Sequence, residues 1–158
     1  MKAVSMGSLY STKPEAVAVR EAADKPAILA ALSELFAHGW GLDPAAVLEH
    51  LEERERLGST GFGRGVAIPH ARIGGLNRPV AALLKLPQPV DFAAADGMPV
   101  DLVFGLLSPE NSGATHLHAL AAISRLVRDE RVHEALSEAP DAEALYGLLT
   151  NATDRDAA

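Results

Sequence analysis

The sequence predicts an α/β fold, a single-domain sandwich in which helices flank a mixed β-sheet. Two helical patterns come first, three short apolar strands follow, and the last third is again helical. This order is typical of a sheet that is covered by helices. The chain has 158 residues, which fits one compact domain. Hydrophobic residues make up 48% of it and aromatic residues only 4%, so we expect a core of mostly Leu, Ala and Val.

Two helices are predicted after a weakly patterned N-terminal segment. That segment covers residues 1–24, where the alternation of Val17 and Val19 allows an edge strand. The first helix then has Asp24 as its N-cap, with Gly39 as its expected stop. The second helix should begin at Asp43 and end near Gly58. Apolar residues recur at helical spacing through both: Ile28, Leu29, Leu32, Leu35, Phe36, Val47, Leu48 and Leu51.

Three strands are predicted in the middle of the chain. The first is closed by Pro69. The second should break at Pro87 and Pro89, because proline cannot donate to a strand ladder. The third is almost continuously apolar, as expected of a buried strand. These strands span residues 66–68, 80–86 and 100–107.

The last third is predicted to be helical. An amphipathic stripe runs from Leu117 to Val127, with Thr115 as its expected N-cap. Short helices follow at residues 132–136 and 142–149. The domain itself is therefore expected over residues 25–150, followed by a polar C-terminal tail over residues 151–158.

Composition excludes several classes of protein. The formal net charge is −7 and no basic patch is evident, which argues against a nucleic-acid-binding face. The chain has no cysteine, so disulfides, thiolate zinc sites and cysteine nucleophiles are excluded. The N-terminal residues lack the apolar stretch of a signal peptide, and no apolar run approaches a membrane span. We therefore expect a cytoplasmic protein with no direct membrane insertion, whose acidic surface would suit a basic protein partner.

His70 follows the first predicted strand and stands next to a glycine-rich stretch. Four of the eight residues in 58–65 are glycines. Such a loop can bend sharply and offer backbone N–H groups to phosphate oxygens. A histidine here can be a base, a metal ligand or a nucleophile, and as a nucleophile toward phosphorus it must be neutral. Histidines at strand ends are also common without any chemical role, so both interpretations stay open at this point.

Five residues of the loop are candidates for holding phosphate. The loop contains neither a Walker A motif nor a dinucleotide fingerprint, because no Gly-Lys pair occurs and the glycines lead into a strand. The hydroxyl groups of two of these residues could equally serve the turn itself. The candidates are Ser59, Thr60, Gly61, Gly63 and Gly65.

Arginine and histidine side chains supply further candidates. Arg54 lies just before the glycine loop and could hold a phosphate bidentately, although a solvated, salt-bridged helix surface is the alternative. His116 and His118 lie two positions apart on a helix and so point about 200° apart. Both cannot readily face one site. No His-x-x-x-His pair occurs, and we expect no metal site.

Together these segments resemble the EIIA domains of the fructose/mannitol class of the phosphoenolpyruvate-dependent phosphotransferase system. The resemblance covers roughly residues 25–150. It rests on RERLGSTGFGRGVAIPH at residues 54–70, PVDLVF at 99–104 and THLHAL at 115–120. The first of these motifs is long and specific. The resemblance implies a mixed sheet flanked by helices, the fold of the fructose/mannitol EIIA type.

The resemblance also implies a chemistry for three residues. His70 stands at the position that is phosphorylated by an HPr-type phosphocarrier protein. His116 matches a second histidine that helps to hold the phosphoryl group, and Arg54 falls on the family's active-site arginine. His118 matches no position with an established role. Neither a metal nor an organic cofactor is implied, because phosphoryl transfer needs mainly positioning and charge stabilisation.

Two functions in different classes remain after this comparison of motifs. The motifs look more like the nitrogen-regulatory EIIA, a phosphohistidine carrier that binds potassium transport components or sensor kinases in one phosphorylation state only. The alternative is a sugar-transport EIIA that passes phosphate from His70 to an EIIB cysteine. The 158 residues contain neither an EIIB nor an EIIC segment, which favours the first. A degenerate binding module is a third option, against which the intact set of Arg54, His70 and His116 argues.

Overall fold

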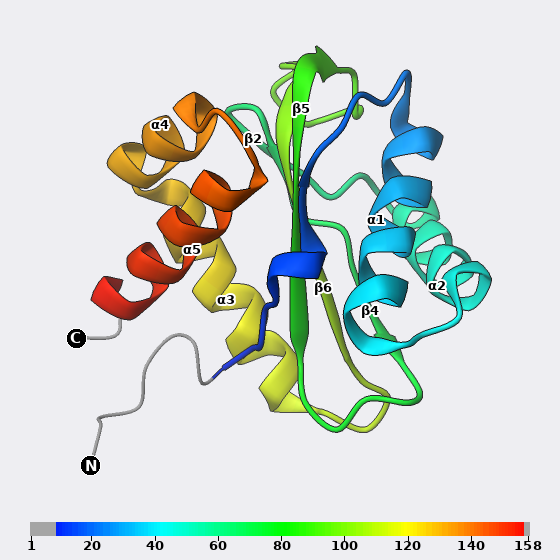
Figure 1. Cartoon of the computed structure of the whole chain (residues 1–158). Coiled ribbons are helices and arrows are strands. Elements are labelled where there is room, and N and C mark those ends of the chain that lie inside the picture. The colour runs from blue at the N-terminus through cyan, green and yellow to red at the C-terminus, as the bar shows by residue number, and fades with distance from the viewer. Residues whose placement is uncertain (1–8, 157–158) are drawn as a thin grey trace.

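Helices cover both faces of a central six-stranded sheet, so the chain forms three layers (Figure 1). The computed structural model describes residues 9–156, and side chains over residues 9–151. The predicted α/β class is confirmed. The helices are α1 (Lys25–Trp40), α2 (Pro44–Arg56), α3 (Ala114–Arg128), α4 (Glu130–Glu138) and α5 (Ala142–Asp156), with a 3-10 turn at Pro14–Ala16. The strands are β1 (Val17–Val19), β2 (Gly61–Gly63), β3 (Val66–Ala67), β4 (His70–Ile73), β5 (Val80–Val90) and β6 (Val100–Pro109).

Helices α1 and α2 begin where their caps predict. The carboxylate of Asp24 accepts a hydrogen bond from the N–H of Ala27 at 2.9 Å, and Asp43 accepts one from Ala45 at 3.2 Å. The predicted stop at Gly39 is wrong, because α1 continues to Trp40. Gly41 ends it instead, since its φ of 67° is the left-handed conformation that glycine adopts without strain.

The sheet has the order β1-β5-β6-β3-β2, and β4 pairs with β6 beyond the end of β3. β3 and β4 together behave as one interrupted strand. Val66 and Ala67 pair in parallel with Leu102 and Val103, and His70 resumes the same register opposite Leu106. Ile68 and Pro69 lie in the interruption, so His70 opens a strand that the sequence analysis did not predict.

The predicted break of the second strand at Pro87 and Pro89 is wrong. β5 runs through both prolines to Val90, with a register irregularity against β6 between Lys85 and Val90. β1 pairs with β5 only as far as Lys85, so the prolines fall where no second neighbour needs their missing N–H groups.

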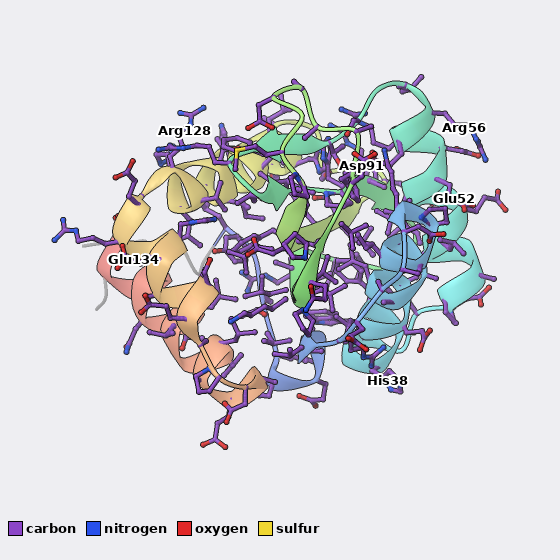
Figure 2. All side chains as sticks on the ribbon, turned by 90° about the horizontal axis from the view of Figure 1, so that it is seen from above. His38, Glu52, Arg56, Asp91, Arg128 and Glu134 are labelled. Carbon is purple, nitrogen blue, oxygen red and sulfur yellow. The ribbon has the colours of Figure 1, made fainter. Side chains whose placement is uncertain are left out.

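Each face of the sheet has its own core. α1 and α2 pack on one face through a cluster that includes Leu32 and Phe36. α3, α4 and α5 cover the other face, where Phe104 and Ile123 are buried. Charged side chains project outward from the helices (Figure 2). Among the residues described, no helix combines the length and the apolar character needed to cross a membrane.

Two boundaries in the C-terminal third differ from prediction. α3 begins at Ala114 with Gly113 as its N-cap residue, so Thr115 lies inside the helix and is not its cap. α5 continues to Asp156, through most of the segment that was expected to be a polar tail. At the other end of the chain, β1 is an edge strand at Val17–Val19.

We expect the Gly105→Ala substitution in β6 to destabilise the fold. A Cβ atom at Gly105 would lie 2.8 Å from Cδ2 of Leu32 and 2.8 Å from Cε2 of Phe36, closer than packed carbon atoms tolerate. Overpacking of this kind costs about 1–3 kcal/mol in the free energy of unfolding, which urea denaturation measures. Gly147→Ala is the matched control, because a Cβ there meets nothing within 4 Å and the position is helical. Equal stability of the two variants would contradict this account of the β6–α1 packing.

Candidate functional site

A pocket of about 540 Å³ lies at the edge of the sheet where β4 is flanked by α2 and α3. Ten residues line it, from three elements that are distant in the sequence. They are His50, Glu53, Arg54 and Leu57 on α2 or directly after it, His70, Ala71 and Arg72 on β4, and His116, Leu117 and Leu120 on α3.

The side chain of His70 is held by a backbone carbonyl that belongs to neither β3 nor β4. Its Nδ1 lies 2.7 Å from the carbonyl oxygen of Ile68. A carbonyl can only accept, so Nδ1 carries a proton and donates it to Ile68. In the neutral ring, Nε2 is then left with an unprotonated lone pair, which is the form that a nucleophilic histidine needs.

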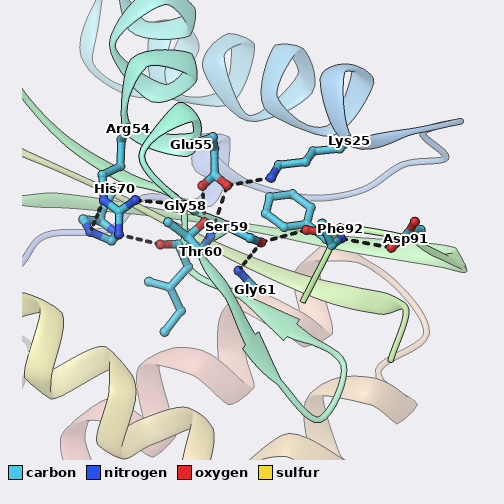
Figure 3. A network of polar contacts seen from close by, with 12 residues as sticks. Lys25, Arg54, Glu55, Gly58, Ser59, Thr60, Gly61, His70, Asp91 and Phe92 are labelled. Carbon is cyan, nitrogen blue, oxygen red and sulfur yellow. Dashed lines mark hydrogen bonds and ion pairs between the residues drawn. The ribbon is translucent and has the colours of Figure 1, made fainter. Parts of the chain in front are cut away.

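Arg54 contacts the unprotonated ring nitrogen of His70 directly. Its Nε donates to Nε2 of His70 at 3.3 Å, and its Nη1 donates to the carbonyl oxygen of Gly58 at 2.9 Å (Figure 3). The second bond ties the guanidinium group to the start of the glycine loop. The geometry therefore places a permanent cation at the atom where a phosphoryl group would arrive.

His116 completes the pair of histidines, and His118 does not take part. The ring of His116 lies 5.8 Å from that of His70, centroid to centroid, and its side chain is buried with 4% exposed. His118 is exposed on the outer surface of α3. The helical geometry thus separates the two residues, as the sequence predicted.

Burial and nearby cations keep His70 and His116 uncharged. Burial lowers the pKa of His70 below its usual value, the Arg54 and Arg72 charges lower it further, and the bond to Ile68 offsets part of this. Burial, with Arg72 and then His70, lowers the pKa of His116 to about 4. Both imidazoles are therefore neutral at pH 7.

The loop residues do not come to this pocket. The hydroxyl of Ser59 donates to the carbonyl oxygen of Phe92 at 2.7 Å, and that of Thr60 donates to the carboxylate of Glu55 (Figure 3). The N–H groups of Thr60 and Gly61 are also bonded within the loop region. Their polar groups serve the structure of the loop and are not directed at His70.

The remaining glycines of the stretch belong to a hairpin. β2 and β3 are joined by Arg64 and Gly65, whose φ angles of 59° and 84° are those of a two-residue turn of type I′. A Cβ atom added at Gly63 would contact Asp96, and one added at Gly65 would contact Asp101. Neither aspartate lines the pocket. These glycines therefore form the tight turn between β2 and β3.

Two residues of the site were missed by the sequence analysis. Arg72 lies two positions after His70 on β4, so both side chains lie on the same face of the strand. Arg72 could be found only by recognising β4.

The side chain of Glu55 is only 6% exposed. It forms an ion pair with Lys25 at 2.8 Å and accepts a hydrogen bond from Thr60 (Figure 3). This buried carboxylate fixes the loop whose Gly58 carbonyl holds Arg54.

Within the part of the chain that is described, no group of three or more His, Cys, Asp or Glu side chains is placed to hold a metal ion. The pocket combines the neutral imidazoles of His70 and His116 with the guanidinium groups of Arg54 and Arg72, and His50 and Glu53 also line it. Such an arrangement suits an anion that forms a bond to nitrogen.

Comparison with known proteins agrees with this geometry. Residues 11–152 match the family model described as "Phosphoenolpyruvate-dependent sugar phosphotransferase system, EIIA 2". A nitrogen regulatory protein of Bradyrhizobium diazoefficiens is 47% identical over 122 residues, which are 75% of this chain and 80% of that protein. One from Pseudomonas aeruginosa is 48% identical over 109 residues, or 69% and 71% of the two chains.

Solved structures lead to the same class of protein. The crystal structure of nitrogen regulatory protein IIA-Ntr from Neisseria meningitidis superposes with a TM-score of 0.79 and 35% identity, covering 87% of this chain and 95% of that one. The chain therefore belongs to the EIIA type 2 family of the phosphoenolpyruvate-dependent phosphotransferase system. Within that family, its similarity is to the nitrogen-regulatory members.

We expect Arg54→Gln to raise the pKa of His70. The Arg54 charge disfavours the imidazolium form, so its removal moves the pKa upward toward 6.5, while burial still holds it below that value. NMR titration of the His70 ring measures the shift. Arg56→Gln is the control, since Arg56 ends the same helix but lies at the periphery of the molecule (Figure 2). A lower or unchanged His70 pKa in Arg54→Gln would contradict the electrostatic role of Arg54.

Proposed function

We propose that this chain is a regulatory phosphocarrier of the nitrogen-type phosphotransferase system, which accepts a phosphoryl group on Nε2 of His70. The observation that carries the proposal is the bond from Nδ1 of His70 to the Ile68 carbonyl, which leaves the Nε2 lone pair in the pocket. The donor is an HPr-type phosphocarrier protein. The protein is proposed to act in the cytoplasm, and the transfer needs neither a metal nor an organic cofactor.

The transfer is a displacement at phosphorus. The Nε2 lone pair of His70 attacks the phosphorus of the donor's phosphohistidine, and a new N–P bond forms. The donor's phosphorylated ring carries a proton on its other nitrogen, so its N–P bond breaks with the electron pair on the donor nitrogen and the donor leaves as a neutral imidazole. The Nδ1–H group of His70 stays hydrogen-bonded to the Ile68 carbonyl throughout, so no proton has to move. Catalysis then depends on positioning and on charge stabilisation.

Cations around the pocket stabilise the arriving charge. The Arg54 Nε–H group, which contacts Nε2 of His70 at 3.3 Å before the reaction, turns to the phosphoryl oxygens once the lone pair is used. Arg72, whose charge already lowers the pKa of both histidines, adds a second cation. Charge-assisted hydrogen bonds of this kind are the strong ones, and they favour the phosphorylated state.

The rim of the pocket is suited to a protein partner. Leu57 and Leu117 line it with 83% and 59% of their surfaces exposed, unusually high for large apolar side chains. They stand on opposite sides, one directly after α2 and the other on α3. A protein that covers them excludes water from the phosphorus during transfer.

Phosphorylation itself is the output of the proposed system. A phosphoryl group adds about −1.5 to −2 charge to a pocket that has two exposed leucines on its rim. A partner that packs on Leu57 and Leu117 in the unphosphorylated state would then either be released or form an additional contact with the charged phosphoryl group. The proposed targets are regulatory proteins such as potassium transport components or sensor kinases.

His70→Ala is expected to abolish phosphorylation. The protein is incubated with phosphoenolpyruvate, enzyme I and the HPr-type phosphocarrier, and mass spectrometry follows the gain of one acid-labile phosphate. His118→Ala should gain the phosphate normally, because this exposed histidine lies outside the pocket. If His70→Ala still carried an acid-labile phosphate, the assignment of His70 would be wrong.

A regulatory carrier is expected to transfer its phosphate poorly to EIIB domains. The phosphorylated protein is mixed with EIIB domains from the same cell, and the phosphate on each chain is followed over time. The phosphocarrier serves as a control, since transfer back to it should be rapid. Rapid transfer to an EIIB cysteine would instead support the alternative, a sugar-transport EIIA.

A further inference from the structure

Ser108 is a buried polar residue that neither the motifs nor the proposed mechanism uses. It lies near the end of β6, opposite Arg72 of β4, and its side chain is 0% exposed. Its Oγ is 2.7 Å from Nδ1 of His116. A serine this deeply buried needs a partner for its hydroxyl group, because an unpaired polar group inside a protein is costly.

The direction of this hydrogen bond follows from what else Ser108 can reach. Among the described residues, the ring of His116 is the only partner found for Ser108 Oγ. If Nδ1 of His116 donated to Oγ, the hydroxyl hydrogen would be left in the core with no acceptor. If the hydroxyl donates to Nδ1, every polar hydrogen of the pair is satisfied. Ser108 is therefore the donor, and Nδ1 of His116 is the acceptor.

We propose that the Ser108 hydroxyl sets the tautomer of His116, so that its ring proton stays on Nε2 and donates to the phosphoryl group on His70. Ser108 thus acts as a positioning residue. The inference rests on the proposed function of His70. It adds to that function which ring nitrogen of His116 carries the proton.

The two histidines are then held in opposite tautomers. The Ile68 carbonyl places the proton of His70 on Nδ1 and leaves a lone pair on Nε2. The Ser108 hydroxyl places the proton of His116 on Nε2. One ring offers an electron pair to phosphorus, and the other offers an N–H group to a phosphoryl oxygen. The rings lie 5.8 Å apart, centroid to centroid, which leaves room for a phosphoryl group at the shared pocket.

The neutral state of His116 makes the tautomer matter. An imidazolium would donate from both nitrogens, whatever its neighbour. Burial lowers the pKa of His116 to about 4, so near pH 7 the ring carries one proton only. A neutral His116 in the wrong tautomer would present a lone pair to an oxyanion, and the two would repel each other.

The first test is the tautomer itself, read from ¹⁵N chemical shifts of the His116 ring in the whole chain. We expect a protonated Nε2 in the wild-type protein and a mixture of the two tautomers in Ser108→Ala. A wild-type ring protonated on Nδ1 would overturn the inference without any variant. Ser33→Ala is the matched control, because it also removes a buried hydroxyl, which donates to Leu29 in α1 away from the pocket.

The second test is the equilibrium of phosphoryl exchange with the HPr-type phosphocarrier. Ser108→Ala should lower the equilibrium constant for phosphorylation of the chain by about fivefold, the size expected for one weakened hydrogen bond. His116→Ala should lower it at least as far, and Ser33→Ala should leave it unchanged. A normal equilibrium in Ser108→Ala would overturn the inference. Failure of the wild-type protein to be phosphorylated would overturn the proposed function instead, whatever the tautomer.

Discussion

The interruption of the strand between β3 and β4 determines the chemistry of the site. Because Ile68 belongs to neither half, its carbonyl is available to hold Nδ1 of His70 at 2.7 Å. Pro69, which has no N–H group, reinforces the break, while its own carbonyl still accepts from Leu106. A continuous strand would keep the pairing with β6 but would lose the bond that selects the tautomer of His70.

The three-layer architecture supplies the other components of the site. β4 is an edge strand, so α2 on one face and α3 on the other both reach His70. Arg54 comes from the last turn of α2, and His116 from the first turn of α3. The buried Glu55–Lys25 ion pair, together with Thr60, then fixes the loop to which Arg54 is tied.

The sequence correctly predicted features that depend on residues close together in the chain. The caps at Asp24 and Asp43 are hydrogen bonds within three residues, and the separation of His116 from His118 follows from helical geometry alone. β4 could not be predicted, because it depends on pairing with β6 much later in the chain. The path of β5 through Pro87 depends on β1 ending its pairing with β5 at Lys85, which no local pattern shows. The glycine stretch looked like a phosphate loop, but its φ angles at Arg64 and Gly65 belong to a hairpin.

The contact between Arg54 and His70 also bears on selectivity. The Arg54 Nε–H group occupies the same lone pair that attacks phosphorus in the proposed function. The nucleophile is therefore masked until the guanidinium group is drawn away, and a docked donor presents phosphoryl oxygens that can draw it. Electrophiles that bring no oxyanion offer no such exchange of hydrogen bonds. Under the proposed function, Arg54 would therefore favour reaction of His70 with a donor that carries an oxyanion.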